Sequence, residues 1–178
     1  MILDLKYYGD PILRKKCKPI EKITDEIRQL AQDLSETVVA SDGAGLAAPQ
    51  VGHSLCIFVC RYENGVDAEG WPILTSPKIY INPKLSSPSD EMIVHGEGCL
   101  SIPGIYEKVA RPRQIIVEAM DLDGNIFVDE ATGWKARALM HENDHLNGVL
   151  FIDRIHPKAK KKIIPLLADL KKKWNHPH

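Results

Sequence analysis

The chain has 178 residues, which is enough for one domain with a buried core and too few for two comfortable ones. Its 44% hydrophobic and 26% charged residues are close to the globular average, which excludes a disordered or fibrous protein. The net charge of −1 gives no reason to expect DNA or a membrane as a partner, and no apolar run approaches the roughly 18 residues that cross a bilayer. We therefore predict a single domain spanning 1–178.

The first six residues, from Met1 to Lys6, lack a basic region followed by an apolar stretch. We therefore predict no signal peptide and a cytoplasmic protein. The four cysteines form no C-x-x-C pair. In a chain without a signal peptide they are better interpreted as thiols than as a disulfide framework.

In chain order, the first predicted element is an amphipathic helix over 24–41. Its apolar residues recur at helical spacing, Thr24 is a suitable N-cap, and two acidic residues occupy the first turn. Glycines at 43 and 45 end the pattern. The polar stretch 61–78 contains several Gly and Pro residues and predicts a long surface loop.

Strands are predicted from apolar and β-branched runs, the last two of them joined by a tight turn at Asp123-Gly124. They span 55–60, 79–82, 91–95, 105–109, 114–121 and 125–129. A second helix begins at Thr132, ends near Gly148 and is expected to be buried on most sides. A third helix follows over 158–174. Several strands without β-α-β alternation predict an α+β domain, with mostly antiparallel sheets around the second helix.

The second helix carries the sequence His-Glu-Asn-Asp-His at 141–145. At about 100° per residue, His141 and His145 lie about 40° apart on successive turns, so a ring nitrogen of each can reach one metal ion. Glu142 lies about 60° from His145, close enough to take a proton from a water held by that metal. This H-E-x-x-H pattern is typical of metal-assisted hydrolysis. Two solvated helix histidines are the structural alternative.

A catalytic metal site also needs a third protein ligand. The metzincin pattern would place a histidine where the chain has Phe151, and no Glu follows His145. Both familiar metalloprotease arrangements therefore lack a ligand, and the third donor must come from upstream. Cys99, at the end of a predicted strand, is a candidate because a thiolate with two imidazoles suits Fe(II), Zn(II) or Co(II). The alternative is that Cys99 is a small buried apolar residue.

Three separated segments, in this order and spacing, resemble the signatures of the peptide deformylase family. They read Gly-Ala-Gly-Leu-Ala-Ala-Pro-Gln at 43–50, Glu-Gly-Cys-Leu-Ser at 97–101 and His-Glu-Asn-Asp-His-Leu at 141–146. The resemblance implies a metal-dependent hydrolase that removes the formyl group from the N-terminal formylmethionine of nascent polypeptides and releases formate. It also implies one divalent metal ion, natively Fe2+ in most bacterial members, with Zn2+, Ni2+ or Co2+ as alternatives in purified protein.

The resemblance also implies roles for single residues. Cys99, His141 and His145 would bind the metal, and Glu142 would be the general base. The side-chain amide of Gln50 and the backbone N–H of Leu100 would meet the negative charge that develops on the formyl oxygen. The peptide would lie as an added strand along 44–46. The residues implied to bind substrate are Ala44, Gly45, Glu97, Gly98, Trp134 and Ala138.

The chain departs from the usual family pattern at three positions. Ala44 replaces a larger residue, which is expected to widen the methionine pocket. Met140 stands where a Gln commonly precedes the first histidine, and Asn143 replaces a usually apolar residue. Neither supplies a ligand, so we expect them to affect metal retention and rate rather than the chemistry.

Three arginines lie close to these segments in the sequence. Arg137 is one turn before His141 on the predicted helix, from where it can reach a carboxylate such as Glu97. Arg111 and Arg113 flank a proline after a predicted strand, and we interpret both as surface or ion-pair residues.

The end of the chain is strongly basic, with eight Lys or Arg and one Asp from 154 onward. One interpretation is a solvated basic face on the docked helix 158–174. The other is docking to ribosomal RNA beside the nascent chain, which would be sensitive to salt.

Two other functions stay open on the sequence alone. A metalloprotease is disfavoured by the missing third ligand. A ribosome-associated binding module with a structural metal is disfavoured because structural zinc sites usually have four protein ligands.

Overall fold

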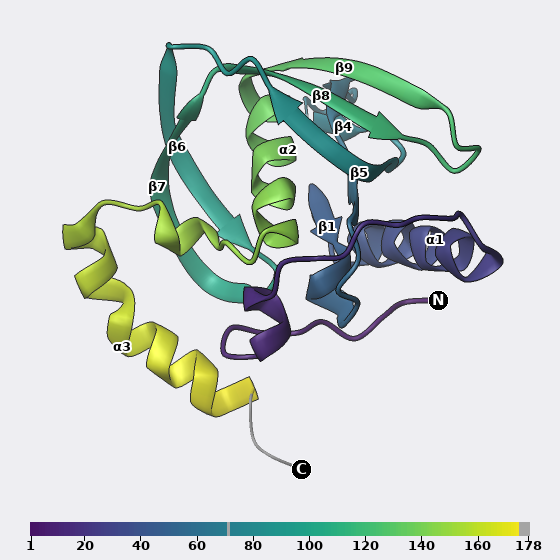
Figure 1. Ribbon diagram of the computed structural model, residues 1–178. Helices are drawn as coiled ribbons and strands as arrows, with labels where there is room; N and C mark the ends of the chain where they lie inside the picture. Colours follow the sequence, from purple (N-terminus) through teal and green to yellow (C-terminus); the bar gives the residue numbers. More distant parts are fainter. Residues whose placement is uncertain (71, 175–178) are drawn as a thin grey trace.

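The computed structural model describes residues 1–70 and 72–174 (Figure 1). Residue 71, in the predicted loop, and residues 175–178, in the predicted domain, lie outside the described part. The α-helices in the described ranges are α1 (Asp25–Ala40), α2 (Gly133–Leu146) and α3 (Pro157–Trp174). The strands are β1 (Gly45–Ala47), β2 (Ile57–Cys60), β3 (Glu63–Val66), β4 (Pro72–Leu74), β5 (Lys78–Ser86), β6 (Met92–Cys99), β7 (Ile102–Pro112), β8 (Gln114–Met120) and β9 (Ile126–Thr132). The 3-10 helices are η1 (Pro11–Arg14), η2 (Ala48–Val51) and η3 (Phe151–Asp153).

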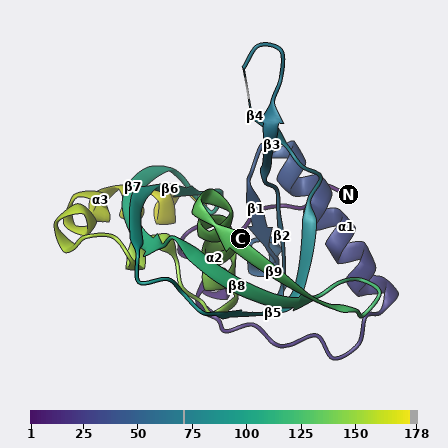
Figure 2. The same cartoon turned by 90° about the horizontal axis from the view of Figure 1, so that it is seen from above.

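The strands form one large sheet and two ribbons. The sheet is antiparallel, in the order β1-β2-β5-β8-β9, while β6 pairs with β7 and β3 with β4. Helix α2 stands between the β6–β7 ribbon and the large sheet (Figures 1 and 2). This arrangement confirms the predicted α+β fold with antiparallel sheets around a central helix.

Strand β2 shows how the core forms on both sides of the sheet. All four of its residues are buried, because successive side chains point to opposite faces and each face is covered by a helix. Ile57 and Val59 belong to the apolar cluster that contains the buried face of α1. Phe58 and Cys60 belong to the cluster that contains Leu139 of α2. The large sheet therefore holds α2 firmly from one side.

The ends of α2 are fixed by local backbone geometry. Thr132 occupies the N-cap position as predicted, although its side chain makes no capping hydrogen bond. The helix ends before Gly148, whose φ of +70° lies in the left-handed region that favours glycine. A Cβ at Gly148 would lie 2.5 Å from the backbone oxygen of Arg14, so a larger residue would also push this segment away from η1.

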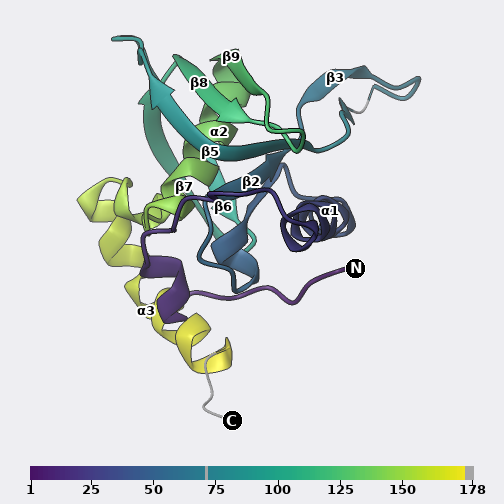
Figure 3. The ribbon, with the colours of Figure 1, turned by 45° about the vertical axis from the view of Figure 1, so that its right-hand side comes forward.

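The stretch 61–78 is not one long loop, which corrects the prediction. Strands β3 and β4 pair as an antiparallel hairpin that projects from the body of the molecule (Figure 3). All four residues of β3 are exposed. Its two strands have only four and three residues, which is too short to show the apolar alternation from which strands are recognised.

Helix α3 packs one apolar face against the rest of the chain. Ile163 and Leu167 are buried in a cluster with residues of β7 and η3. The ring of Trp174 stacks on Tyr7 with centroids 4.1 Å apart. The lysines of the helix are all exposed: Lys158, Lys160, Lys161, Lys162, Lys171, Lys172 and Lys173. Among the described helices, none combines the length and apolar character that crossing a bilayer requires.

Candidate active site

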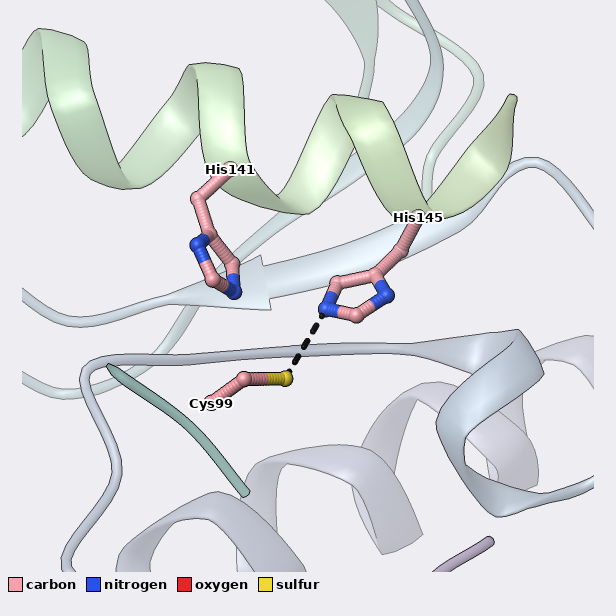
Figure 4. A group of neighbouring side chains, drawn as sticks. All are labelled: Cys99, His141 and His145. Atoms are coloured by element: carbon pink, nitrogen blue, oxygen red, sulfur yellow. Dashed lines mark hydrogen bonds between the residues drawn. The ribbon is translucent and has the colours of Figure 1, made fainter. Parts of the chain in front are cut away.

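Cys99, His141 and His145 come together between the β6–β7 ribbon and α2 (Figure 4). One potential ligand atom from each lies within 4.8 Å of the others. The Cys99 Sγ is 3.3 Å from His145 Nε2, and a nitrogen of His141 faces the same space. The two histidines lie one turn apart on α2, while Cys99 is the last residue of β6, just after an irregularity in its pairing with β7.

The donor set fits a divalent cation that accepts sulfur and nitrogen ligands. Burial lowers the pKa of His145 well below its ordinary value, which leaves the neutral imidazole that metal binding requires. His141 is oriented from behind, because its Nδ1 lies 2.9 Å from Glu97 Oε1. A histidine held in this way presents Nε2 toward the thiol. A contact between the other ring nitrogen and a carboxylate is the usual support of a histidine that binds a metal.

Glu142 is buried beside this group, on the same helix. Burial raises the pKa of its carboxyl to about 7. Its Oε2 is buried without a hydrogen-bond partner among the described residues. Its Oε1 lies against Gly45 of β1, where a Cβ would come within 2.4 Å of that oxygen. The position of the carboxylate is therefore defined by close packing against a glycine.

Gln50, in η2, contacts Cys99 of this group through its side-chain amide. Its side-chain oxygen accepts a hydrogen bond of 2.8 Å from the backbone N–H of Ala47. Its Nε2 is thereby turned toward Ser101 Oγ at 3.2 Å and Cys99 Sγ at 3.5 Å. A buried amide with its donor side fixed in this way can stabilise negative charge next to the thiol.

Glu97 is part of a buried ion network that sequence reasoning missed in part. Arg111 donates to both of its oxygens at 2.6 and 2.8 Å, and Arg137 donates to Oε2 at 2.6 Å. Arg111 also donates to Asp144 at 2.9 Å, and Arg154 donates to both oxygens of Asp144 at 2.6 Å. Burial alone would raise the pKa of Glu97, but its contacts with Arg111 and His141 hold it far below its usual range.

The network agrees with what the sequence led us to expect of its arginines. Arg137 does contact Glu97, as expected. Arg111 is ion-paired, which is one of the two interpretations given for it, and it lies in the interior with a side chain only 3% exposed. Arg113 is exposed and pairs with Glu91, as the same interpretation allowed. One signal in the sequence could have identified Arg111: a Glu97 that is buried needs a positively charged partner.

A cavity of about 510 Å³ opens onto this group. All six residues expected to bind substrate line it, as do Gln50, Cys99, Leu100, His141 and Glu142, whereas His145 is not in its wall. Lining residues that the sequence did not single out are Asp42, Gly96, Pro103, Gly104 and Tyr106. Trp134 stands at the mouth with 54% of its surface exposed. The cavity is therefore open to an extended ligand and ends at the thiol and the buried carboxylate.

A thiol, two imidazoles and a buried carboxylate on an H-E-x-x-H helix at the end of an open cavity define a hydrolase of the metal-dependent class. Comparison with known proteins narrows this class. The family model described as Polypeptide deformylase matches residues 2–161. The chain belongs to the peptide deformylase family, whose members are metal-dependent, and it removes the N-terminal formyl group from nascent polypeptides.

Relatives of known sequence and structure resemble the chain over nearly its whole length. A peptide deformylase of Acinetobacter baumannii (strain SDF) is 41% identical over 162 residues, which cover 91% of this chain and 88% of that protein. One of Fusobacterium nucleatum is 41% identical over 174 residues, covering 97% and 94%. The crystal structure of peptide deformylase from Ehrlichia chaffeensis superposes with a TM-score of 0.86 at 34% identity, covering 97% of this chain and 98% of that one.

Proposed function

We propose that Cys99, His141 and His145 hold one divalent metal ion and that formyl-amide hydrolysis takes place there. The observation that carries the proposal is the convergence of one sulfur and two ring nitrogens within 4.8 Å, next to the buried Glu142. When bound, the metal supplies Lewis-acid chemistry, which polarises the formyl oxygen and lowers the pKa of water. The remaining steps belong to side chains of this protein.

Glu142 is proposed to move the proton. In the reaction water adds to the formyl carbon, the C–N bond breaks, and formate and a free α-amine are released. Glu142 accepts a proton from the attacking water and returns a proton to the departing nitrogen. A carboxyl whose pKa is about 7 suits both transfers near neutral pH, because it is neither a very weak base nor a very weak acid there.

Gln50 and Leu100 are proposed to stabilise the oxygen of the tetrahedral intermediate. The Nε2 of Gln50 already points toward Cys99, and Leu100 follows Cys99 directly in the chain. Donors fixed before the reaction need no reorganisation as charge develops, and each is typically worth a factor of about 10²–10³ in rate.

The formylated peptide is proposed to bind as a strand along β1. Within the described chain β1 pairs with β2 alone, so its other edge faces the cavity. Ala44 and Gly45 offer little steric obstruction to a peptide backbone. Glu97, Gly98, Trp134 and Ala138 then form the walls around the methionine side chain, with Trp134 at the mouth.

Release of formate tests this function directly. Formyl-Met-Ala-Ser should release formate, a chelator should stop the reaction, and added divalent metal should restore it. A structural metal predicts bound metal without formate release, and a protease predicts cleavage inside the peptide chain. Either of those results with metal-loaded protein would contradict the proposal.

The native metal is proposed to be Fe2+. A thiolate with two imidazoles is a soft, electron-rich ligand set that Fe2+, Zn2+, Ni2+ and Co2+ all accept. Metal analysis of protein purified without oxygen should therefore show iron at about one atom per chain. Zinc at that ratio in anaerobic protein would contradict the assignment.

Helix α3 is proposed to dock on ribosomal RNA beside the emerging chain. Its lysines lie near both ends of the helix and are exposed, while its buried face is used for packing. Co-sedimentation with ribosomes should fall steeply as salt rises and should be lost when Lys161, Lys162 and Lys172 are changed to Glu. Lys15, Lys22 and Lys108, which are exposed and lie outside the helix, supply a matched triple substitution. Binding that survives the α3 changes, or that is lost equally in both triple variants, would contradict the docking site.

The cytoplasm is the proposed location, because nascent chains carrying formylmethionine are the substrate. Fractionation of cells should recover formate-releasing activity with the ribosome-containing cytoplasmic fraction. Recovery with the envelope fraction would overturn the assignment.

A further inference from the structure

Arg154 makes a two-pronged contact with the helix that carries the histidines. Its Nε and Nη2 donate to the two oxygens of Asp144, each at 2.6 Å. The side chain of Asp144 is 9% exposed, and the residue lies on α2 directly before His145. A bidentate contact of this type fixes the orientation of the carboxylate as well as neutralising its charge.

The contact continues without interruption to His141. Asp144 Oδ2 also accepts from Arg111 Nη1 at 2.9 Å, and the other two donor groups of Arg111 hold the two oxygens of Glu97. Glu97 in turn holds His141 Nδ1 at 2.9 Å. A single guanidinium, that of Arg111, therefore links two buried carboxylates from β6 and α2.

Because of how the charges are shared, this series of ion pairs depends on Arg154. Arg111 is shared between Asp144 and Glu97, and its side chain is only 3% exposed. Without Arg154, Asp144 would keep Arg111 as its one cationic partner among the described residues. A buried carboxylate that loses a bidentate partner attracts the remaining cation more strongly. Arg111 would then shift toward Asp144, and Glu97 would lose the two-pronged contact that fixes its orientation and, through it, the orientation of the His141 ring.

We infer that Arg154 is a positioning residue for the metal centre, acting through Asp144, Arg111 and Glu97 on His141. The inference rests on the proposed function, because it takes Cys99, His141 and His145 as the metal ligands. Arg154 itself is 45% exposed on the side chain and lies outside the cavity, so it acts only through its partners. Groups behind a ligand typically change metal affinity by about tenfold to a hundredfold.

A purely structural role would be different, and the chain offers a control for it. Arg154 would then only fasten the segment that leads from α2 to α3. Arg14 fastens the same segment through Asp153, with contacts of 2.5 and 3.1 Å, and has no contact with Asp144. Arg14→Met thus loosens the segment and leaves the ion network intact.

The test uses Co2+ as the probe, in full-length protein with no peptide present. Co2+ bound by a thiolate gives an absorption band whose loss to a chelator yields a dissociation rate. Arg154→Met should release Co2+ about tenfold to a hundredfold faster than the unchanged protein. Arg14→Met should stay within about threefold of it. Equal rates in Arg154→Met and the unchanged protein, or equal acceleration in both variants, would overturn the inference.

A double substitution tests the route. Asp144→Asn removes the charge through which Arg154 acts. The double variant should therefore release Co2+ at nearly the same rate as Asp144→Asn alone. If each change accelerated Co2+ release independently, so that the two factors multiplied in the double variant, the route through Asp144 would be contradicted. If Arg154→Met does not fold, Arg154→Lys serves in its place, because it keeps the charge and loses the two-pronged contact. Failure of the unchanged protein to bind Co2+ with a thiolate band would instead refute the proposed metal centre.

Discussion

The carboxylate of Glu142 lies directly against the α-carbon of Gly45, so closely that a Cβ there would be 2.4 Å from Oε1 and 2.7 Å from Cγ and Cδ. These contacts join α2 to the edge strand of the large sheet. They restrict the positions that the carboxylate of the proposed base can take on the side of β1.

Gly45→Ala is expected to displace Glu142 and lower kcat by about a hundredfold, because misplacement of a reacting group by about 1 Å has an effect of that size. Metal content should stay the same, since the three atoms nearest to a Cβ at Gly45 all belong to Glu142, which is not a proposed ligand. Gly96→Ala is the matched control, because Gly96 lines the same cavity and a Cβ there meets nothing within 4 Å. A Gly45→Ala enzyme with unchanged kcat would show that the contact does not position the base.

Gln50→Ala is expected to lower kcat by about 10²–10³ with little change in bound metal, because one donor to the developing oxyanion is lost. Steady-state formate release together with metal analysis measures both quantities. Ser101→Ala is the control, because Ser101 Oγ contacts the same amide at 3.2 Å but has no proposed part in the reaction. Normal turnover in Gln50→Ala would remove Gln50 from the mechanism.

Metal removal is expected to destabilise the fold. An ion bound only by the folded chain adds about 2.7 kcal/mol at a hundredfold excess over its Kd. For a domain of this size that corresponds to a fall in Tm of roughly 5–10 °C on chelation. Cys99→Ala should show almost none of this fall, because it lacks the proposed sulfur ligand. A Tm that chelation leaves unchanged in the unaltered protein would argue against a tightly held ion.

Stability below neutral pH is expected to depend on Asp129. Burial alone would raise the pKa of this carboxyl, but hydrogen bonds from Lys135, Tyr80 and Lys78 hold it below its ordinary value. A carboxyl whose pKa is lower in the folded chain contributes stability above the pKa of the unfolded chain, about 3.9. That contribution is lost as pH falls through the lower, folded value.

Asp129→Asn should therefore be less stable than the unchanged protein at pH 7, and the difference should shrink as pH falls below about 4. Urea unfolding at pH 7, 5, 4 and 3 measures it. Glu130→Gln, at the exposed neighbouring position on β9, should show a much smaller difference at every pH. A difference for Asp129→Asn that is constant over this range would exclude the charge as its cause.

The sequence predicts the parts of this fold whose causes are local. Thr24 begins α1, where its hydroxyl accepts from the N–H of Ile27, and Asp123-Gly124 joins β8 to β9. Strand β1 escapes prediction because it has only three residues, and the β3–β4 hairpin because its strands have only four and three residues.

At the candidate site, too, local patterns can be recognised in the sequence and contacts between distant residues cannot. The spacing of His141, Glu142 and His145 follows from helical geometry and is visible in the sequence. The partnership of Arg111 with Glu97 joins residues 14 positions apart on two paired strands, and that of Arg111 with Asp144 joins a strand to a helix. No local pattern identifies such pairs, because each arginine is recognised only by the buried charge that it meets.

The proposed ligands come from two elements, the end of β6 and the last turns of α2, which are 42 positions apart in the sequence and meet only when the ribbon packs on the helix. A chain still being synthesised therefore has no complete centre until α2 has left the ribosome and folded against β6. Each newly made molecule passes through an interval in which it is itself a nascent polypeptide and cannot yet process any other.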